Sequence, residues 1–203
     1  MRRHQVPQRW FLFFSLLVFT PALAQDSARC VGGKPSAPIR IEVFSDFQCP
    51  ACRSFYLETM RSVLADYADA GKVCVVYREF PLNQHPYARP AARYAHAALQ
   101  LGVRQWALVA DALYLSQDRW SLDGQLEPVL ASALSKEDLD RVKKLAAEDA
   151  VETVIDRDIA LAKQFQVTST PTFFISANGK TEKITGVIQY PILRRYLDHL
   201  LNP

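Results

Sequence analysis

The pattern of apolar and polar positions predicts two strands on either side of a helix in the first part of the chain. Residues 39–44 are mostly apolar and rich in β-branched side chains, which indicates a strand. Apolar residues then recur every three to four positions from Phe55 to Tyr67, as in a helix, and Gly71 is a natural end for it. The continuous apolar run 73–77 indicates a second strand, covered on both faces. Such a βαβ unit places its two strands parallel.

The middle of the chain, from 86 to 165, has no strand pattern and is rich in Ala and Leu. We expect four or five helices there, packed as an inserted bundle, with joints near Gly102, Trp120 and Ser135. The sequence from Ser135 to Asp138 has the form of a capping box, so it should open one helix. Trp106, Tyr114 and Trp120 are expected in the core of the bundle or at its seam with the sheet.

Strand character returns at the end of the chain. Asn178-Gly179 separates two β-prone runs, 172–175 and 181–184, and this pattern predicts a hairpin. An amphipathic helix over 190–201 should close the fold. The order of elements is therefore βαβ, a helical insert, then ββα, which is an α/β fold.

The first 24 residues have the form of a secretory signal peptide. Arginines 2, 3 and 9 make a positive start, residues 11–18 make an apolar core, and Ala22-Leu23-Ala24 is a small-x-small cleavage motif before Gln25. The alternative is a membrane anchor, but the apolar run is short for a bilayer span. We expect cleavage near Gln25 and a soluble protein in the periplasm or outside the cell.

Removing that segment changes the charge balance. The full chain has 24 Lys and Arg against 21 Asp and Glu, and the segment contains three of the arginines, so the mature chain is formally neutral. This argues against nucleic acid as a partner. About 179 residues remain, enough for a sizeable core.

A Cys-x-x-Cys pair, Cys49 and Cys52, lies where the first predicted strand meets its helix. Cys49 falls at the helix N-cap, where free N–H groups and the helix dipole favour a thiolate, and Pro50 falls at the first helical position. Three interpretations remain open: a redox-active dithiol, a structural bridge, or half of a metal site. A tight bridge would be strained, and a zinc site needs a second close pair, whereas Cys30 and Cys74 are isolated. We favour the dithiol and expect no metal or cofactor.

Three segments in this order resemble the DsbA-like branch of the thioredoxin-fold oxidoreductases. They are spread along most of the mature chain and read FSDFQCPAC (44–52), YREFPL with a following His-Pro (77–86), and VTSTPTFF (167–174). The resemblance implies a thioredoxin fold with an inserted helical domain, divided as 25–85, 86–165 and 166–203. It also implies a protein disulfide oxidoreductase that acts through Cys49, Pro50, Ala51 and Cys52.

The resemblance carries further expectations about the site and its partners. Pro171 should be cis and lie against the dithiol, with Thr170 offering its backbone to an extended substrate. In such a sheet the N-terminal strand lies parallel to the strand after the first helix, so Cys30 and Cys74 should form a structural disulfide; the alternative is two buried thiols. The partners would be reduced, unfolded proteins and a membrane quinone-linked reoxidase of the DsbB or vitamin-K-epoxide-reductase type. The protein would be a monomer.

Two positions depart from the family pattern. Val43 stands where the family often has a buried acid, and neighbouring Glu42 should face the other side of the strand. Ala51 stands where the oxidising type-member has a histidine, so we expect a milder oxidant. The direction of electron flow stays open, with a reductase or isomerase and a metal-delivery factor as alternatives. His85 is interpreted as a loop or helix-entry residue because nothing in the sequence pairs it with a nucleophile.

Overall fold

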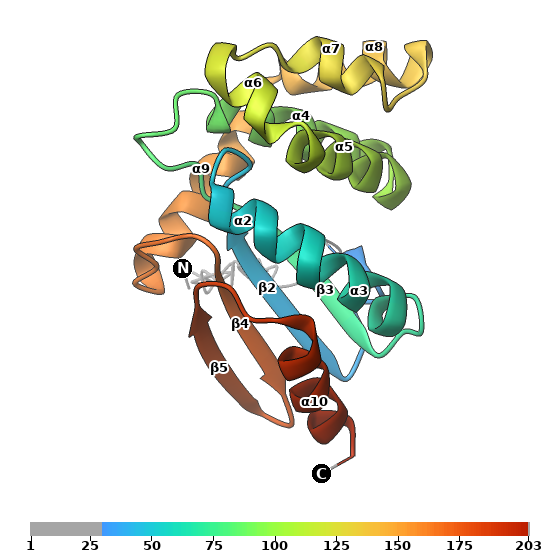
Figure 1. The fold of residues 1–203 in the computed structure, drawn as a ribbon, viewed down its shortest axis with the longest axis vertical. Coiled ribbons are helices and arrows are strands. Elements are labelled where there is room, and N and C mark those ends of the chain that lie inside the picture. Colours follow the sequence, from blue (N-terminus) through green and yellow to red (C-terminus); the bar gives the residue numbers. More distant parts are fainter. Residues whose placement is uncertain (1–29, 203) are drawn as a thin grey trace, which may run out of the picture.

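A five-stranded mixed sheet forms the centre of the molecule, in the order β1-β3-β2-β4-β5 (Figure 1). The computed structural model describes residues 30–202. The strands are β1 (Cys30–Gly32), β2 (Ile39–Ser45), β3 (Val73–Glu79), β4 (Thr172–Ala177) and β5 (Lys180–Thr185). All seven residues of β3 are buried, as the continuous apolar run predicted.

The strand directions confirm one prediction and correct another. β2 and β3 are parallel, with Ile39 opposite Val73 and Ser45 opposite Glu79, as the βαβ pattern predicted. The prediction of a parallel N-terminal strand is wrong, because β1 pairs with β3 antiparallel. Residues 33–38 are too short for the crossover that joins parallel strands, so the chain reverses between β1 and β2.

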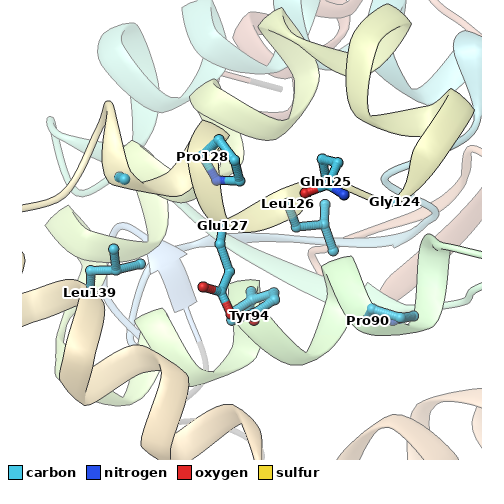
Figure 2. Close-up of a pocket in the computed structure, with 9 residues that line it drawn as sticks. Pro90, Tyr94, Gly124, Gln125, Leu126, Glu127, Pro128 and Leu139 are labelled. Atoms are coloured by element: carbon cyan, nitrogen blue, oxygen red, sulfur yellow. Dashed lines mark hydrogen bonds between the residues drawn. The ribbon is translucent and has the colours of Figure 1, made fainter.

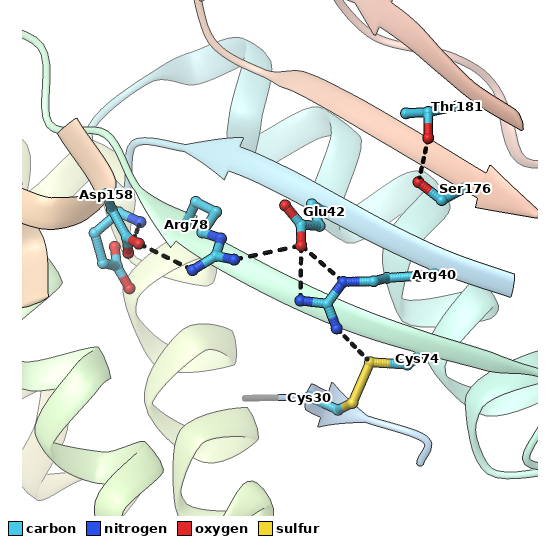
Figure 3. Close-up of polar contacts among 9 residues, drawn as sticks. Cys30, Arg40, Glu42, Cys74, Arg78, Asp158, Ser176 and Thr181 are labelled. Atoms are coloured by element: carbon cyan, nitrogen blue, oxygen red, sulfur yellow. Dashed lines mark hydrogen bonds and ion pairs between the residues drawn. A yellow bond between two sulfur atoms is a disulfide. The ribbon is translucent and has the colours of Figure 1, made fainter. Parts of the chain in front are cut away.

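The antiparallel β1 nevertheless brings the two isolated cysteines together. Cys30 and Cys74 form a disulfide with their Cα atoms 5.5 Å apart, as predicted, and the Arg40 Nη1 group donates to Cys74 Sγ at 3.6 Å. Figure 3 shows this disulfide beside a chain of ion pairs that joins Arg40 to Glu42, Glu42 to Arg78 and Arg78 to Asp158.

The helical run after the dithiol is continuous but changes its winding. It consists of α2 (Pro50–Phe55), the π-helical η1 (Tyr56–Met60), α3 (Arg61–Val63) and the π-helical η2 (Leu64–Ala68). The C-terminal helix α10 (Tyr190–Leu201) packs beside this run, and the Thr59 hydroxyl donates to the Ile188 carbonyl at 2.7 Å. The hairpin turn between β4 and β5 has both Asn178 and Gly179 at positive φ, as the Asn-Gly signal predicted.

The insert contains six helices in the described part of the chain, whereas four or five were predicted. They are α4 (Ala88–Leu101), α5 (Val103–Leu115), α6 (Gln117–Asp123), α7 (Leu126–Ala131), α8 (Lys136–Ala146) and α9 (Asp149–Gln164). The helices α6 and α7 have seven and six residues, too few for a clear 3.6-residue pattern. The Ser135 side chain accepts a hydrogen bond from Asp138 N, which confirms the predicted cap of α8.

Aromatic side chains fill the seam between the insert and the sheet. Trp106, Tyr114 and Trp120 are fully buried, as predicted. The ring centroids of Trp106 and Tyr77, on β3, lie 4.9 Å apart, and so do those of Tyr114 and Phe47. This packing fixes the insert against the end of the sheet that carries the dithiol. Within residues 30–202, no helix is long and apolar enough to cross a bilayer.

Candidate active site

The dithiol lies where the sequence placed it, at the start of α2. Cys49 is the N-cap, with an extended backbone (φ −78°, ψ 122°), and Pro50 follows at the first position of the helix. Both cysteines are reduced in this structure. Cys49 keeps 7% of its surface exposed and Cys52 only 1%, so Cys49 is the sulfur that a second molecule can reach.

The surroundings of Cys49 favour its thiolate. Hydrogen bonding from Cys52 is the largest cause, and it lowers the pKa of Cys49 from 9.0 to about 5 against the opposing effect of burial. Smaller contributions come from Thr170 and from the backbone N–H groups of Cys52 and Ala51. These are the free amides of the first helical turn, so the helix start does supply the predicted stabilisation.

The surroundings of Cys52 favour its thiol. Burial is the largest cause and raises the pKa of Cys52 well above its ordinary value, and the hydrogen bond and charge of Cys49 act in the same direction. The side chain of Ser45 and the backbone of Asp46 oppose this effect. One proton is therefore unequally shared between the two sulfurs, with a thiolate at Cys49 and a thiol at Cys52.

The loop before β4 lies against this pair. The Thr170–Pro171 peptide bond is cis, as the resemblance implied. Cys49 Sγ lies 3.5 Å from the main-chain oxygen of Thr170, across 121 positions of sequence. The Pro171 carbonyl accepts from Gly186 N at 2.8 Å, which ties the loop to the end of β5.

Two glutamines fasten the dithiol loop to the insert, and sequence reasoning missed both. The Gln117 side-chain amide donates to the carbonyls of Phe47 and Cys49 at 2.7 and 3.0 Å. Gln48 in turn donates to the Ser121 carbonyl at 3.1 Å and accepts from Tyr87 N at 2.8 Å. The hydrogen bonds between the dithiol loop and α6 join residues more than sixty positions apart, so the sequence carries no local signal of them.

Asp46 joins the dithiol loop to the 80–87 loop. One carboxylate oxygen accepts from Leu82 N and lies 2.8 Å from His85 Nδ1, and the other accepts from Gln48 N at 2.7 Å. His85 does lie in a loop, but it contacts a residue three positions before Cys49. The sequence carries no sign of this contact with Asp46, because it is folding that brings the 80–87 loop beside the active-site segment.

Val43 and Ala51, the two positions that depart from the family pattern, give the dithiol neither an acid nor an imidazole. Val43 is completely buried and supplies no acid near Cys52. Glu42 faces the opposite side of the sheet and pairs with Arg78 and Arg40 (Figure 3), so it does not replace that acid. Ala51 is exposed at the start of α2, and its methyl side chain offers no hydrogen-bond donor to Cys49.

A pocket of about 600 Å³ lies elsewhere, between α4, α7 and α8 of the insert (Figure 2). Tyr94, Glu127 and Leu139 are among the residues that line it. Neither thiol nor the cis-proline loop borders this pocket, so it does not belong to the dithiol site.

Comparison with known proteins agrees with this geometry. The thioredoxin family model matches residues 25–198. The chain is 25% identical over 150 residues to the probable disulfide bond formation protein D of Bacillus cereus, covering 72% of this chain and 69% of that protein. It superimposes on alpha-DsbA1 of Wolbachia pipientis with a TM-score of 0.70 and 25% identity, covering 83% of this chain and 88% of that one.

A longer relative also contains a segment similar to this chain. The Na(+)/H(+) antiporter NhaA 3 of Salinispora tropica is 33% identical over 154 residues, which cover 74% of this chain but 22% of the antiporter. That name describes a much larger protein. The family match and the DsbA structure instead agree with the dithiol and the cis-proline loop. The chain therefore belongs to the thioredoxin family and, within it, to the DsbA-like protein disulfide oxidoreductases.

Proposed function

We propose that this protein is an oxidase that donates the Cys49–Cys52 disulfide to reduced, unfolded proteins. The observation that carries the proposal is the placement of the two thiols, with Cys49 at the N-cap of α2 and Cys52 the more deeply buried, and with the pKa of Cys49 lowered to about 5 and that of Cys52 raised. A thiol of low pKa is a good leaving group, so a mixed disulfide at Cys49 is easily resolved by the client. Stabilising the Cys49 thiolate also stabilises the reduced protein, which makes its disulfide more oxidising.

The proposed exchange reaction takes place at the sulfurs of Cys49 and Cys52. A client thiolate attacks Cys49 Sγ, the disulfide breaks, and Cys52 receives its electron pair. The second client thiol then attacks the client sulfur of the mixed disulfide and displaces Cys49 as a thiolate. The client gains a disulfide, and the protein leaves with Cys49 as thiolate and Cys52 as thiol. The proton that the second client thiol gives up balances the one that Cys52 gains.

Thr170 and Pro171 would form the platform for the client. The main-chain oxygen of Thr170 lies beside the reacting sulfur, so an extended client segment paired with this loop would present its cysteine to Cys49. This mode uses main-chain hydrogen bonds and accepts many client sequences, as a general oxidase requires.

Export and reoxidation complete the proposal. The signal-peptide pattern lies in residues 1–24, outside the described residues, and supports a periplasmic or secreted protein. An oxidising compartment also suits the Cys30–Cys74 disulfide. Each turnover leaves the dithiol reduced, so we infer a membrane quinone-linked reoxidase of the DsbB or vitamin-K-epoxide-reductase type. The protein would act as a monomer.

Oxidation of a reduced two-cysteine peptide tests the assignment of the site. The oxidised protein should convert the peptide to its disulfide, and Cys49→Ser should abolish that reaction because the attacked sulfur is gone. A double variant, Cys30→Ser with Cys74→Ser, is the matched control and should retain the reaction while it remains folded. Undiminished peptide oxidation by Cys49→Ser would refute the assignment.

A further inference from the structure

A hydrogen-bonded turn, residues 46–49, carries the main chain from the end of β2 into α2. The Cys49 N–H donates to the main-chain carbonyl of Asp46 at 3.1 Å, which closes the turn. The Gln48 N–H donates to Asp46 Oδ1 at 2.7 Å. Asp46 therefore accepts two main-chain hydrogens of the segment that leads into Cys49, one with its backbone and one with its side chain.

The Asp46 carboxylate is the buried centre of this turn. Its side chain has no exposed surface, so it depends on donors from the protein rather than on bulk water. Besides Gln48, it accepts at Oδ2 from the Leu82 N–H and from His85 Nδ1, both at 2.8 Å. One local donor and two donors from the loop after β3 thus fix the orientation of this carboxylate.

His85 supplies the one of these three donors that belongs to a side chain. Because a carboxylate only accepts, the hydrogen of the 2.8 Å contact is carried by His85 Nδ1. The main chain of His85 is fixed as well, since its N–H donates to the Leu82 carbonyl at 2.9 Å and its carbonyl accepts from Ala88 N at 3.2 Å. The imidazole is therefore held at both ends and presents a fixed donor to Asp46.

Other side chains near the turn do not duplicate this contact. The two glutamines that fasten the dithiol loop bind main-chain groups. Arg89, a cation that lines a groove of about 790 Å³ together with His85, pairs with Glu152 and Asp156. Within residues 30–202, His85 is the one side chain that hydrogen-bonds to the Asp46 carboxylate.

We propose that His85 is a positioning residue, which holds the turn before Cys49 in place through the Asp46 carboxylate. With the Nδ1 hydrogen present, Asp46 keeps the orientation that receives the Gln48 N–H, and Cys49 enters α2 as its N-cap. Without that hydrogen, the buried carboxylate lacks a donor and reorients to find another, and the turn relaxes. The first amides of α2 are then aimed less well at Cys49 Sγ. The inference rests on thiol exchange at Cys49 but not on the direction of electron flow.

Equilibration with glutathione tests this role. His85→Leu removes the donor, weakens the stabilisation of the Cys49 thiolate, and should shift the equilibrium about tenfold toward the oxidised protein, the size of one hydrogen bond to a charged group. In the reduced protein, thiolate absorbance should place the ionisation of Cys49 about one pH unit higher, the same factor of ten. His85→Asn keeps an N–H near the position of Nδ1 and should restore most of both values.

Two controls separate this role from a general loss of structure. His199→Leu, at an exposed histidine in the last turn of α10, should change neither value. In an Asp46→Asn background, His85→Leu should have little further effect, because His85 acts through that carboxylate. Should His85→Leu fail to fold, His85→Ser replaces it, since serine is polar but too short to reach Asp46.

The outcomes distinguish this inference from the proposed function. A merely structural role would lower the thermal stability of His85→Leu but leave the glutathione equilibrium and the ionisation of Cys49 unchanged, and that result would overturn the inference. Equal shifts in His85→Leu and His85→Asn would overturn it too, because the hydrogen bond would not be the cause. In both cases exchange by the wild-type protein stands. If the wild-type protein does not exchange with glutathione at all, the proposed function itself fails.

Discussion

At the scale of single residues, the reactivity of Cys49 comes from its partners rather than from a nearby cation. Its pKa is lowered mainly by the Cys52 thiol, and then by Thr170 and the first amides of α2. Ala51 contributes a backbone N–H but no side-chain donor, and Val43 contributes no acid. A side-chain hydrogen-bond donor at position 51 should therefore make the Cys49–Cys52 disulfide a stronger oxidant.

Ala51→His should make the Cys49–Cys52 disulfide more oxidising. An imidazole at this exposed position would donate to the Cys49 thiolate and further stabilise the reduced form. Equilibration of both proteins with glutathione measures the change. Ala131→His, at an exposed alanine at the end of α7, is the control and should leave the potential unchanged. An unchanged or lower potential for Ala51→His would count against this account of the site.

At the scale of elements, the helical insert holds the active-site loop in place. Gln117, at the start of α6, satisfies two carbonyls of the loop, and Gln48 reaches back to the end of the same helix. The N-cap geometry that activates Cys49 therefore depends on contacts from another part of the chain.

Gln117→Met keeps the size of the side chain but removes both donated hydrogen bonds. The buried Phe47 carbonyl loses a partner, so we expect a loss of about 1–3 kcal/mol in the free energy of unfolding. The Cys49 pKa should also rise as the loop relaxes. Urea unfolding and thiolate absorbance measure the two effects. Gln125→Met, at an exposed glutamine of the same insert, should change neither. A Gln117→Met protein with unaltered stability and Cys49 pKa would contradict the role of Gln117 in holding the dithiol loop.

At the scale of the whole molecule, the sheet joins the two ends of the sequence into one site. β2 lies between β3 and β4, so the loop after β2 and the loop before β4 emerge side by side (Figure 1). This arrangement brings Cys49 to Thr170. Because the stabilised thiolate exists only in the reduced protein, the state of this one site should change the stability of the whole fold.

The stability of the reduced protein relative to the oxidised protein should increase with pH. The pKa of Cys49 is about 5 when folded and near 9.0 in its ordinary state, so between these values the folded reduced chain binds fewer protons than the unfolded one. This contribution is fully present above about pH 9 and is lost as the pH falls through about 5. Thermal unfolding of both forms at pH 4.5, 6 and 8, roughly spanning this window, measures it. A reduced-minus-oxidised difference that does not change across these pH values would contradict the lowered pKa.

Local patterns in the sequence predicted much of this molecule. The βαβ unit, the Asn178-Gly179 hairpin and the cap at Ser135 depend on neighbouring residues, and the dithiol at a helix start does too. The direction of β1 was predicted wrongly because it depends on a short connection rather than on the apolar pattern. The contacts of Gln117 and of Tyr114 with the dithiol segment could not be predicted, since they join residues about seventy positions apart.

The equilibrium potential of the Cys49/Cys52 couple tests the central claim most directly. Equilibration with glutathione at neutral pH, followed by counting free thiols by mass after alkylation, gives this value. The lowered pKa of Cys49, without a histidine at position 51, predicts a potential between roughly −120 mV, the value for a strong oxidase, and about −200 mV. A potential at or below about −270 mV, the value for thioredoxin, would show that the protein is a reductant and would contradict the proposed oxidase.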